Sequence, residues 1–228
     1  MGVKERRERE KSETRDKILD AARELFVTEG YDGVSMRKVA EKIEYSPTAI
    51  YVHFADKNEL FHELCRADFA HLQEVMTSAK MPLDPIERLR QIGRNYIEFG
   101  LRYPNHYVFM FMTPHPEHEP DEEDREIMGN PEVDAYALLK LAVQHAIDAG
   151  RFREELADAE LISQTLWAAV HGVISLNIAK CKDPWVEWRP LAERAELMLD
   201  VTLRGLLRQA PSPSSTGNTR AGAGSEGK

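Results

Sequence analysis

The chain has 228 residues, 42% of them hydrophobic, which is enough for one large domain or for a small domain joined to a medium one. Its formal net charge of −9 argues against a free-standing, nonspecific nucleic-acid binder. The two cysteines, Cys65 and Cys181, are too few for a disulfide framework and favour a reducing cytoplasm.

The two ends of the chain differ from its middle. Residues 1–12 alternate in charge with almost nothing apolar and predict a flexible arm or a frayed helix start, and residues 211–228 are rich in Pro, Ser, Gly and Thr and predict a disordered tail. The charged start argues against a signal peptide. The longest apolar run, Leu166 to Leu176, is far shorter than the roughly 20 residues that cross a bilayer. We therefore expect a cytoplasmic protein without a membrane partner.

The remaining sequence predicts an all-α fold of about nine helices. The residues from Ile18 to Phe26 carry an apolar stripe of helical spacing, Gly30 ends it, and no stretch shows sustained alternation of strand type. Four helix starts are expected at Ser46-Pro47, Asp56 with Glu59, Asp84-Pro85 and Asn130-Pro131. The expected helices lie near 14–29, 36–42, 47–53, 57–78, 85–102, 104–112, 131–149, 158–180 and 188–208, and the Pro-rich, acidic stretch 113–129 is expected to be a loop.

Three short helices within residues 13–60 predict a helix-turn-helix domain. The second presents Val39 and Ala40 inward, and the turn 43–45 is expected to bury Ile43. The third begins at Ser46-Pro47 and exposes small or aromatic residues on its outer side. A recognition helix that enters the major groove needs this layout. Residues 1–65 hold 12 Lys and Arg against 14 Asp and Glu, so DNA contact must come from a local surface.

The stretch from Val34 to Phe61 resembles the helix-turn-helix of the tetracycline-repressor (TetR) family. Its most specific part is Tyr51-x-His53-Phe54-x-x-Lys57-x-x-Leu60, and the segment 18–31 resembles the family's first helix with its Gly-Tyr turn. Far downstream, the sequence LWAAVHGVISL at 166–176 resembles the TetR C-terminal domain type named for Trp-His-Gly.

The resemblance implies roles for individual residues of the first domain. The implied DNA contacts are phosphate contacts by Ser35, Arg37 and Lys57, groove contacts by Ser46, Pro47 and Thr48, and contacts to backbone or base edges by Tyr51 and His53. Two positions depart from the family pattern. Glu44 stands where the turn usually carries Gly, so either the turn shifts or a non-Gly residue adopts a strained conformation. Ala49 replaces a small hydroxyl residue. Phe54 is interpreted as a core residue, and His53 could equally brace the turn.

The larger domain, expected at 61–210, has two terminal helices with more apolar surface than one subunit needs. These helices, near 158–180 and 188–208, predict a homodimer held by a four-helix bundle, and a single thick core is the alternative. An aromatic and Met cluster at 96–112 would suit an apolar pocket, although each of its residues could serve as ordinary core. In the family these helices line the effector site, and the candidate ligand-binding residues are Tyr103, His106, Tyr107, Trp167 and His171.

Two further patterns have plainer interpretations. His115 and His118 with nearby acids suggest a metal site, but a solvated loop is favoured. His171 and Ser175 could form a dyad, but no orienting acid is evident. No metal, cofactor or catalysis is predicted.

The sequence therefore predicts a transcriptional regulator that binds specific DNA. In this hypothesis a homodimer represses from a palindromic double-stranded operator until an unknown small-molecule effector releases it. A helical enzyme that shares the three-helix unit and a helical protein-interaction module are the two alternatives.

Overall fold

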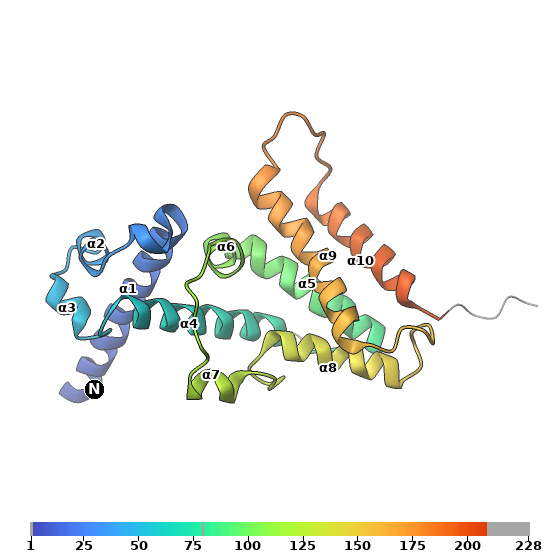
Figure 1. Cartoon of the computed structure of the whole chain (residues 1–228), viewed down its shortest axis with the longest axis horizontal. Helices are drawn as coiled ribbons and strands as arrows, with labels where there is room; N and C mark the ends of the chain where they lie inside the picture. The colour runs from blue at the N-terminus through green and yellow to red at the C-terminus, as the bar shows by residue number, and fades with distance from the viewer. Residues whose placement is uncertain (1, 79, 209–228) are drawn as a thin grey trace, which may run out of the picture.

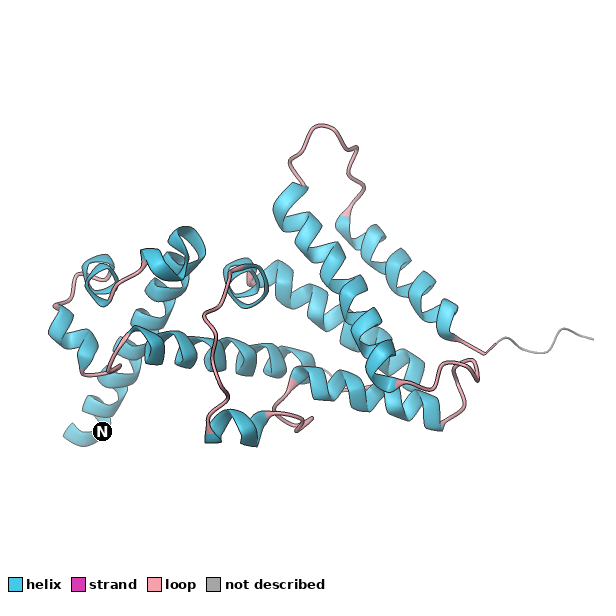
Figure 2. Ribbon diagram, in the orientation of Figure 1, coloured by secondary structure: helices cyan, strands magenta, loops and turns pink. Residues whose placement is uncertain are grey.

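The computed structural model describes residues 2–78 and 80–208, and within them the fold is all-α, with ten helices and no strand (Figures 1 and 2). The predicted tail at 211–228 lies outside the described residues. The helices are α1 Val3–Gly33, α2 Met36–Lys42, α3 Pro47–Tyr51, α4 Lys57–Thr77, α5 Pro85–Arg102, α6 Pro104–Met112, α7 Glu122–Ile127, α8 Ala135–Asp148, α9 Ala159–Lys180 and α10 Leu191–Leu206.

The first helix begins much earlier than expected, because the charges of the predicted arm pair along one helix. Arg6 lies 2.9 Å from Glu10, and Lys4–Glu8 and Arg9–Glu13 repeat the same four-residue spacing. Such pairs stabilise an exposed helix by a few tenths of a kcal/mol each, roughly. Of the two alternatives expected for residues 1–12, the described residues show the helix start, since α1 begins at Val3, and a flexible arm is wrong. Gly30 breaks the helix as predicted, with a φ of 71°.

Three of the four predicted helix starts are confirmed. The side chains of Ser46, Asp56 and Asp84 accept hydrogen bonds from the backbone N–H groups of the first turns of α3, α4 and α5, at 3.2, 2.9 and 2.9 Å respectively. The carboxylate of Glu59, expected to bond the Asp56 N–H, accepts from the N–H of Ala55 instead. The sequence pattern of a capping residue followed by Pro is therefore a reliable start signal for α3 and α5.

Two predictions between residues 113 and 149 are wrong. The expected loop at 113–129 contains the short helix α7, whose cap residue Asp121 accepts from the Asp124 N–H at 2.9 Å. Acidic residues fill its first turn, where the positive end of the helix dipole favours them. The next helix does not start at Asn130-Pro131, because the Asn130 side chain accepts from Glu132 N at 3.1 Å in a turn. Asp134 caps α8 instead.

The N-terminal head, α1 to α3, shares one hydrophobic core with the larger domain. In Figure 1 the long helix α4 runs from the head into that domain, so the expected boundary at residue 60 falls inside a continuous helix. Phe61 on α4 packs edge-on against Phe26 of α1 and Phe109 of α6, with ring centroids 5.0 and 5.1 Å apart. Movement of α4 therefore affects both parts of the molecule.

Helix α5 lies at the centre of the larger domain and contacts α4, α6, α8, α9 and α10. Gly93 permits the close approach of α10, since a Cβ there would lie 2.5 Å from the Leu199 Cδ2 atom. Gly100 does the same for α9, where a Cβ would lie 2.6 Å from Ile174 Cγ2. After α10 the chain pairs with the 151–153 segment through an antiparallel bridge between Phe152 and Leu207.

Candidate nucleic-acid interface and cavity

The third helix presents the outer side that its sequence predicts. Ile50 is fully buried against the head, whereas Ser46, Pro47 and Thr48 are exposed and the Tyr51 ring is 53% exposed. Ser46 itself caps the helix, so its hydroxyl holds the first turn in place. The result is a short, rigid helix whose N-terminal end faces solvent.

The turn before α3 carries Glu44 at the position where the family pattern has Gly. Its φ is 60°, so a non-Gly residue takes the left-handed conformation and the turn keeps its geometry. The Tyr45 N–H closes the turn by donating to the Ala40 carbonyl at 3.0 Å. Ile43, expected to be buried, is only half-buried. Tyr45 was not singled out from the sequence, because a residue before a capping serine carries no local signal, but its ring is exposed beside α3.

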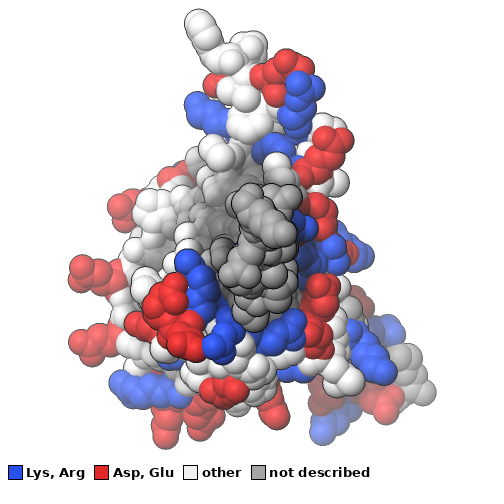
Figure 3. Space-filling view, turned by 90° about the vertical axis from the view of Figure 1, so that its right-hand side faces the viewer, with Lys and Arg blue, Asp and Glu red and all other residues white. Residues whose placement is uncertain are grey.

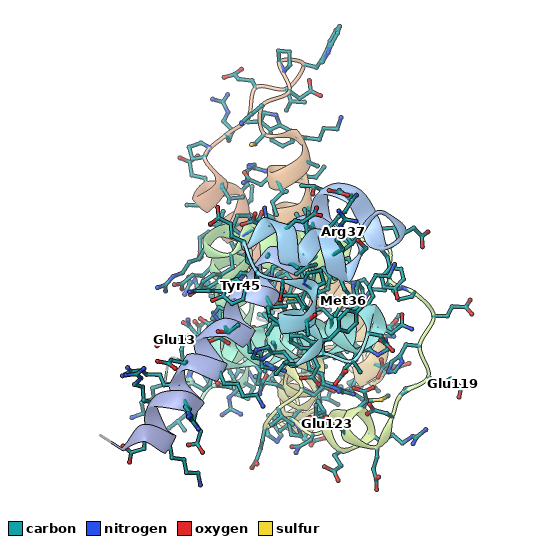
Figure 4. The ribbon with its side chains drawn as sticks, turned by 90° about the vertical axis from the view of Figure 1, so that its left-hand side faces the viewer. Glu13, Met36, Arg37, Tyr45, Glu119 and Glu123 are labelled. Carbon is teal, nitrogen blue, oxygen red and sulfur yellow. The ribbon has the colours of Figure 1, made fainter. Side chains whose placement is uncertain are left out.

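The expected phosphate-contacting residues occupy different environments. Arg37 is the most open, with a side chain 80% exposed and paired with Glu41 at 2.8 Å. In Figure 4, Arg37 and Tyr45 lie on the same end of the head. Ser35 is exposed and caps α2, accepting from Lys38 N at 3.3 Å. Lys57 is half-buried, and its Nζ donates to the Tyr31 carbonyl at 3.0 Å above that ring.

His53 and Phe54 turn toward α1. Phe54 is buried, which confirms its interpretation as a core residue, and the guanidinium of Arg15 lies 5.3 Å from its ring centroid. The Nδ1 atom of His53 is buried without a hydrogen-bond partner among the described residues. Burial, with the nearby charges of Lys11 and Arg15, lowers the pKa of His53 and keeps it neutral at pH 7. This placement favours a bracing role for His53.

The larger domain encloses a cavity of about 270 Å³ between α4, α5, α6, α8, α9 and α10. Of the five candidate ligand-binding residues, Trp167 lines it. Its Nε1 donates to the Tyr96 hydroxyl at 3.1 Å, and that oxygen lies 3.3 Å from His171 Nδ1. The Tyr107 hydroxyl contacts the same nitrogen at 2.6 Å. Tyr107 and His171 therefore lie behind the wall and support it through Tyr96.

Tyr103 and His106 lie outside this lining, at the junction between the head and the larger domain. His106 Nδ1 is 3.0 Å from the Oδ1 atom of Asp68, a carboxylate that also accepts three hydrogen bonds from Arg23, at 2.7, 2.8 and 3.2 Å. The Tyr103 ring packs against His106. The nine-residue helix α6 starts at this junction, while Met110 and Phe111 at its other end line the cavity. The sequence alone does not show which end faces which site.

A second cavity of about 470 Å³ lies between α4 and residues 115–133. His118, expected on a solvated loop, lies 2.9 Å from Asp124, and together with Asp121 it could offer ligand atoms within 4.8 Å of one another. The guanidinium of Arg66 already bonds both carboxylates, so a protein cation occupies this cluster. The Ser175 hydroxyl bonds the Gly172 carbonyl rather than His171.

The comparison with known families assigns both parts of the chain. Residues 18–64 match the model of the bacterial regulatory proteins of the tetR family, and residues 89–202, half of the chain, match a tetracyclin repressor-like C-terminal domain. The chain belongs to the TetR family. The second match includes the Trp167, His171 and Gly172 stretch.

Individual TetR-family proteins resemble the chain to different extents. The HTH-type transcriptional regulator AcrR of Shigella flexneri is 27% identical over 170 residues, which are 73% of this chain and 77% of that protein. The HTH-type transcriptional repressor AcnR of Corynebacterium diphtheriae is 42% identical over 67 residues, 29% of this chain and 35% of that protein. A TetR family transcription regulator from Marinobacter aquaeolei VT8 has a similar structure, with a TM-score of 0.69, 16% identity and coverage of 90% of this chain and 100% of that one.

This TetR-family chain is accordingly a DNA-binding transcriptional regulator, and its relatives are regulators rather than enzymes. Proteins of the family typically act as dimers. On α10 the side chains of Leu197 and Val201 are 63% and 61% exposed, and Leu161 and Leu176 are exposed on α9. Figure 3 views the molecule from the right-hand side of Figure 1, where α10 lies. By length and composition alone α9 could cross a membrane, and only 28% of its most apolar window is buried within the chain.

Proposed function

We propose that a homodimer of this chain represses transcription from a palindromic operator in the cytoplasm, and that a small molecule in the cavity releases it. The observation that carries the proposal is the orientation of α3. Its apolar side is buried and its N-terminal residues Ser46, Pro47 and Thr48 are exposed at the end of the head. The relatives that match this chain include proteins named repressors, which supports repression over activation.

In the proposed complex, two copies of α3 enter successive major grooves about 34–36 Å apart. Thr48 and Tyr51 face the base edges, and the exposed Arg37 contacts a phosphate and fixes the register. Lys57 would reach a phosphate from the start of α4, after it exchanges its bond to the Tyr31 carbonyl. Asp56 and Glu59, acids beside it, limit how much positive potential this corner can supply.

The dimer is proposed to form through α9 and α10. Their exposed apolar side chains would be covered by the same helices of a second copy, in a self-complementary contact. Gly172 on α9 supports this, because a Cβ built there meets no atom of the described residues within 4 Å, apart from its chain neighbours and its own helix backbone, and leaves room for a partner. Contact with a second copy would also explain why α9 is long and apolar, without requiring it to cross a membrane.

Release by a ligand requires that the ligand prefer one spacing of the heads over another. The cavity is well placed to act on that spacing, since Phe69, Leu72 and Met76 of its wall belong to α4, which continues into the head. A ligand that displaces α4 would therefore move the α3 helices relative to the operator.

The Arg37→Ala and Thr48→Ala variants test the proposed division of labour at the interface. Arg37→Ala removes a phosphate contact, so it should weaken binding to operator and random DNA alike. It should also lower by about 1 the slope of the logarithm of affinity against the logarithm of salt concentration. Loss of Thr48 should weaken operator binding by about 1–3 kcal/mol while random DNA is bound as before. Fluorescence anisotropy on both DNAs measures this. Glu98→Ala, on α5 and outside the head, is the control. Equal effects of both substitutions on both DNAs would contradict the assignment.

A further inference from the structure

The cavity of the larger domain has a wall that carries almost no charge. Among the described residues, the lining includes no Lys, Arg or His side chain, and its one carboxylate belongs to Asp134. Apolar side chains make up most of the remainder. Five aromatic residues line it: Phe69, Tyr96, Phe111, Tyr136 and Trp167. A carboxylate, phosphate or sulfate placed here would lose its hydration and gain no counter-charge.

The single carboxylate is already used by the fold. Asp134 Oδ1 accepts from the N–H groups of Tyr136 and Ala137 at 2.8 and 3.1 Å, and Oδ2 accepts from Gly129 N at 2.9 Å. It also lies at the N-terminus of α8, where the helix dipole compensates a negative charge. These donors and the dipole compensate part of the charge of Asp134 and so weaken its attraction for a ligand cation.

The polar groups at the wall are neutral hydrogen-bonding groups. Burial raises the pKa of Tyr96 to about 12 and lowers the pKa of His171, so the network behind Trp167 is uncharged at pH 7. Burial, with the hydrogen bond to Glu160, also raises the pKa of Tyr136 to about 12. Thr202 also lines the cavity, and its hydroxyl has no hydrogen-bond partner among the described residues. This hydroxyl is therefore available to donate and accept hydrogen bonds on a largely apolar wall.

From these residues we propose that the cavity binds an uncharged, largely aromatic or aliphatic molecule with one or two hydrogen-bonding groups. This inference rests on the proposed function, in which the cavity is the effector site. The size follows from volume. A cavity of about 150 Å³ takes benzene, so about 270 Å³ suits a ligand of roughly eleven non-hydrogen atoms. Thr202 and the Tyr96–Trp167 pair would orient its polar groups.

A charge series on one ring system tests the ligand class on the full chain. The probes are 2-naphthol, 2-naphthoate and 2-naphthylmethylammonium, which at neutral pH are neutral, negative and positive, and isothermal titration calorimetry gives their affinities. We expect 2-naphthol to bind at least about tenfold more tightly than either ion. Equal or tighter binding of either ion would overturn the proposal, and so would failure of all three to bind.

The Leu139→Trp variant locates the bound probe, because Leu139 lines the cavity and a larger ring would fill it. It should lose binding of 2-naphthol, whereas Leu141→Trp, on the exposed side of the same helix, should keep it. Unchanged binding by a folded Leu139→Trp variant would place the probe elsewhere and overturn the proposal. The charge series on the unmodified chain remains decisive if this variant does not fold.

A gel shift with DNA from around its own gene, run on the same preparation, separates this inference from the function beneath it. DNA binding together with preference for a charged probe would overturn the ligand class and leave the regulator intact. Preference for 2-naphthol without any DNA binding would overturn the regulator and leave the ligand class intact.

Discussion

Asp68→Ala should lower the free energy of unfolding by about 3–5 kcal/mol, a large fraction of the stability of a domain this size. The Asp68 carboxylate is 1% exposed and joins three helices, because it accepts from Arg23 on α1 and contacts His106 on α6. Its removal leaves the Arg23 guanidinium, itself buried, without its main counter-charge. Chemical denaturation of both proteins at neutral pH measures the difference.

The matched control for this variant is Asp20→Ala. Asp20 also contacts Arg23, at 2.6 Å, but its side chain is 72% exposed, so the expected loss is below about 1 kcal/mol. The Arg23→Met, Asp68→Leu double variant should recover much of the stability, since an apolar pair can replace a buried ion pair. Equal losses for Asp68→Ala and Asp20→Ala would show that the junction does not hold the head in place.

The same carboxylate gives the junction a pH dependence. Burial alone would raise the pKa of Asp68, but the hydrogen bonds from His106 and Arg23 outweigh burial and hold that pKa below its usual value. Its contribution is therefore fully present above the unfolded value of about 3.9 and is lost as the pH falls through the lower, folded pKa. The difference in the free energy of unfolding between the Asp68→Ala variant and the unmodified chain should therefore become smaller in acid.

The Leu197→Glu, Val201→Glu double variant should be monomeric and should bind the operator at least about 10³-fold more weakly. The two residues lie four positions apart on one exposed side of α10, and charges there would be buried without partners in the proposed dimer. A monomer has only one head, so its affinity for the operator should decrease toward that of nonspecific binding. Sedimentation velocity and anisotropy measure the two effects.

Leu83→Glu is the control for the dimer variant, because Leu83 is 92% exposed but precedes α5 and belongs to neither α9 nor α10. It should stay dimeric and bind DNA as before. A Leu197→Glu, Val201→Glu protein that remains dimeric would place the interface elsewhere. One that is monomeric yet binds the operator with full affinity would refute the two-headed mechanism.

The sequence predicted the head well because its signals are local. Ser46-Pro47 fixes the start of α3 through a cap within one turn, and the buried side of α3 follows from residue spacing. The bonds of Lys57 to the Tyr31 carbonyl and of Asp68 to Arg23 join residues 26 and 45 positions apart. No local pattern signals such contacts, so they appear only in the folded chain.

The cavity was predicted less well, because the residues that line it are far apart in the sequence. Six helices enclose it, and the sequence indicated an aromatic cluster without showing which side chains face inward. Trp167, a candidate from the resemblance of its segment, lines the cavity, whereas Thr202 and Tyr136 carry no motif and were missed. Helix α7 was missed because Pro residues and acids favoured a loop, while the capping by Asp121 outweighed them.

Binding of the purified chain to DNA from around its own gene, measured at two salt concentrations, tests the central claim most directly. A dimer that places two α3 helices in successive grooves should contact roughly six to ten phosphates, and its affinity should fall about 10³- to 10⁵-fold between about 50 and 200 mM salt. Sequence-dependent binding with that slope is the result we predict. Binding that is nearly independent of salt, or equal for operator and random DNA, would contradict it.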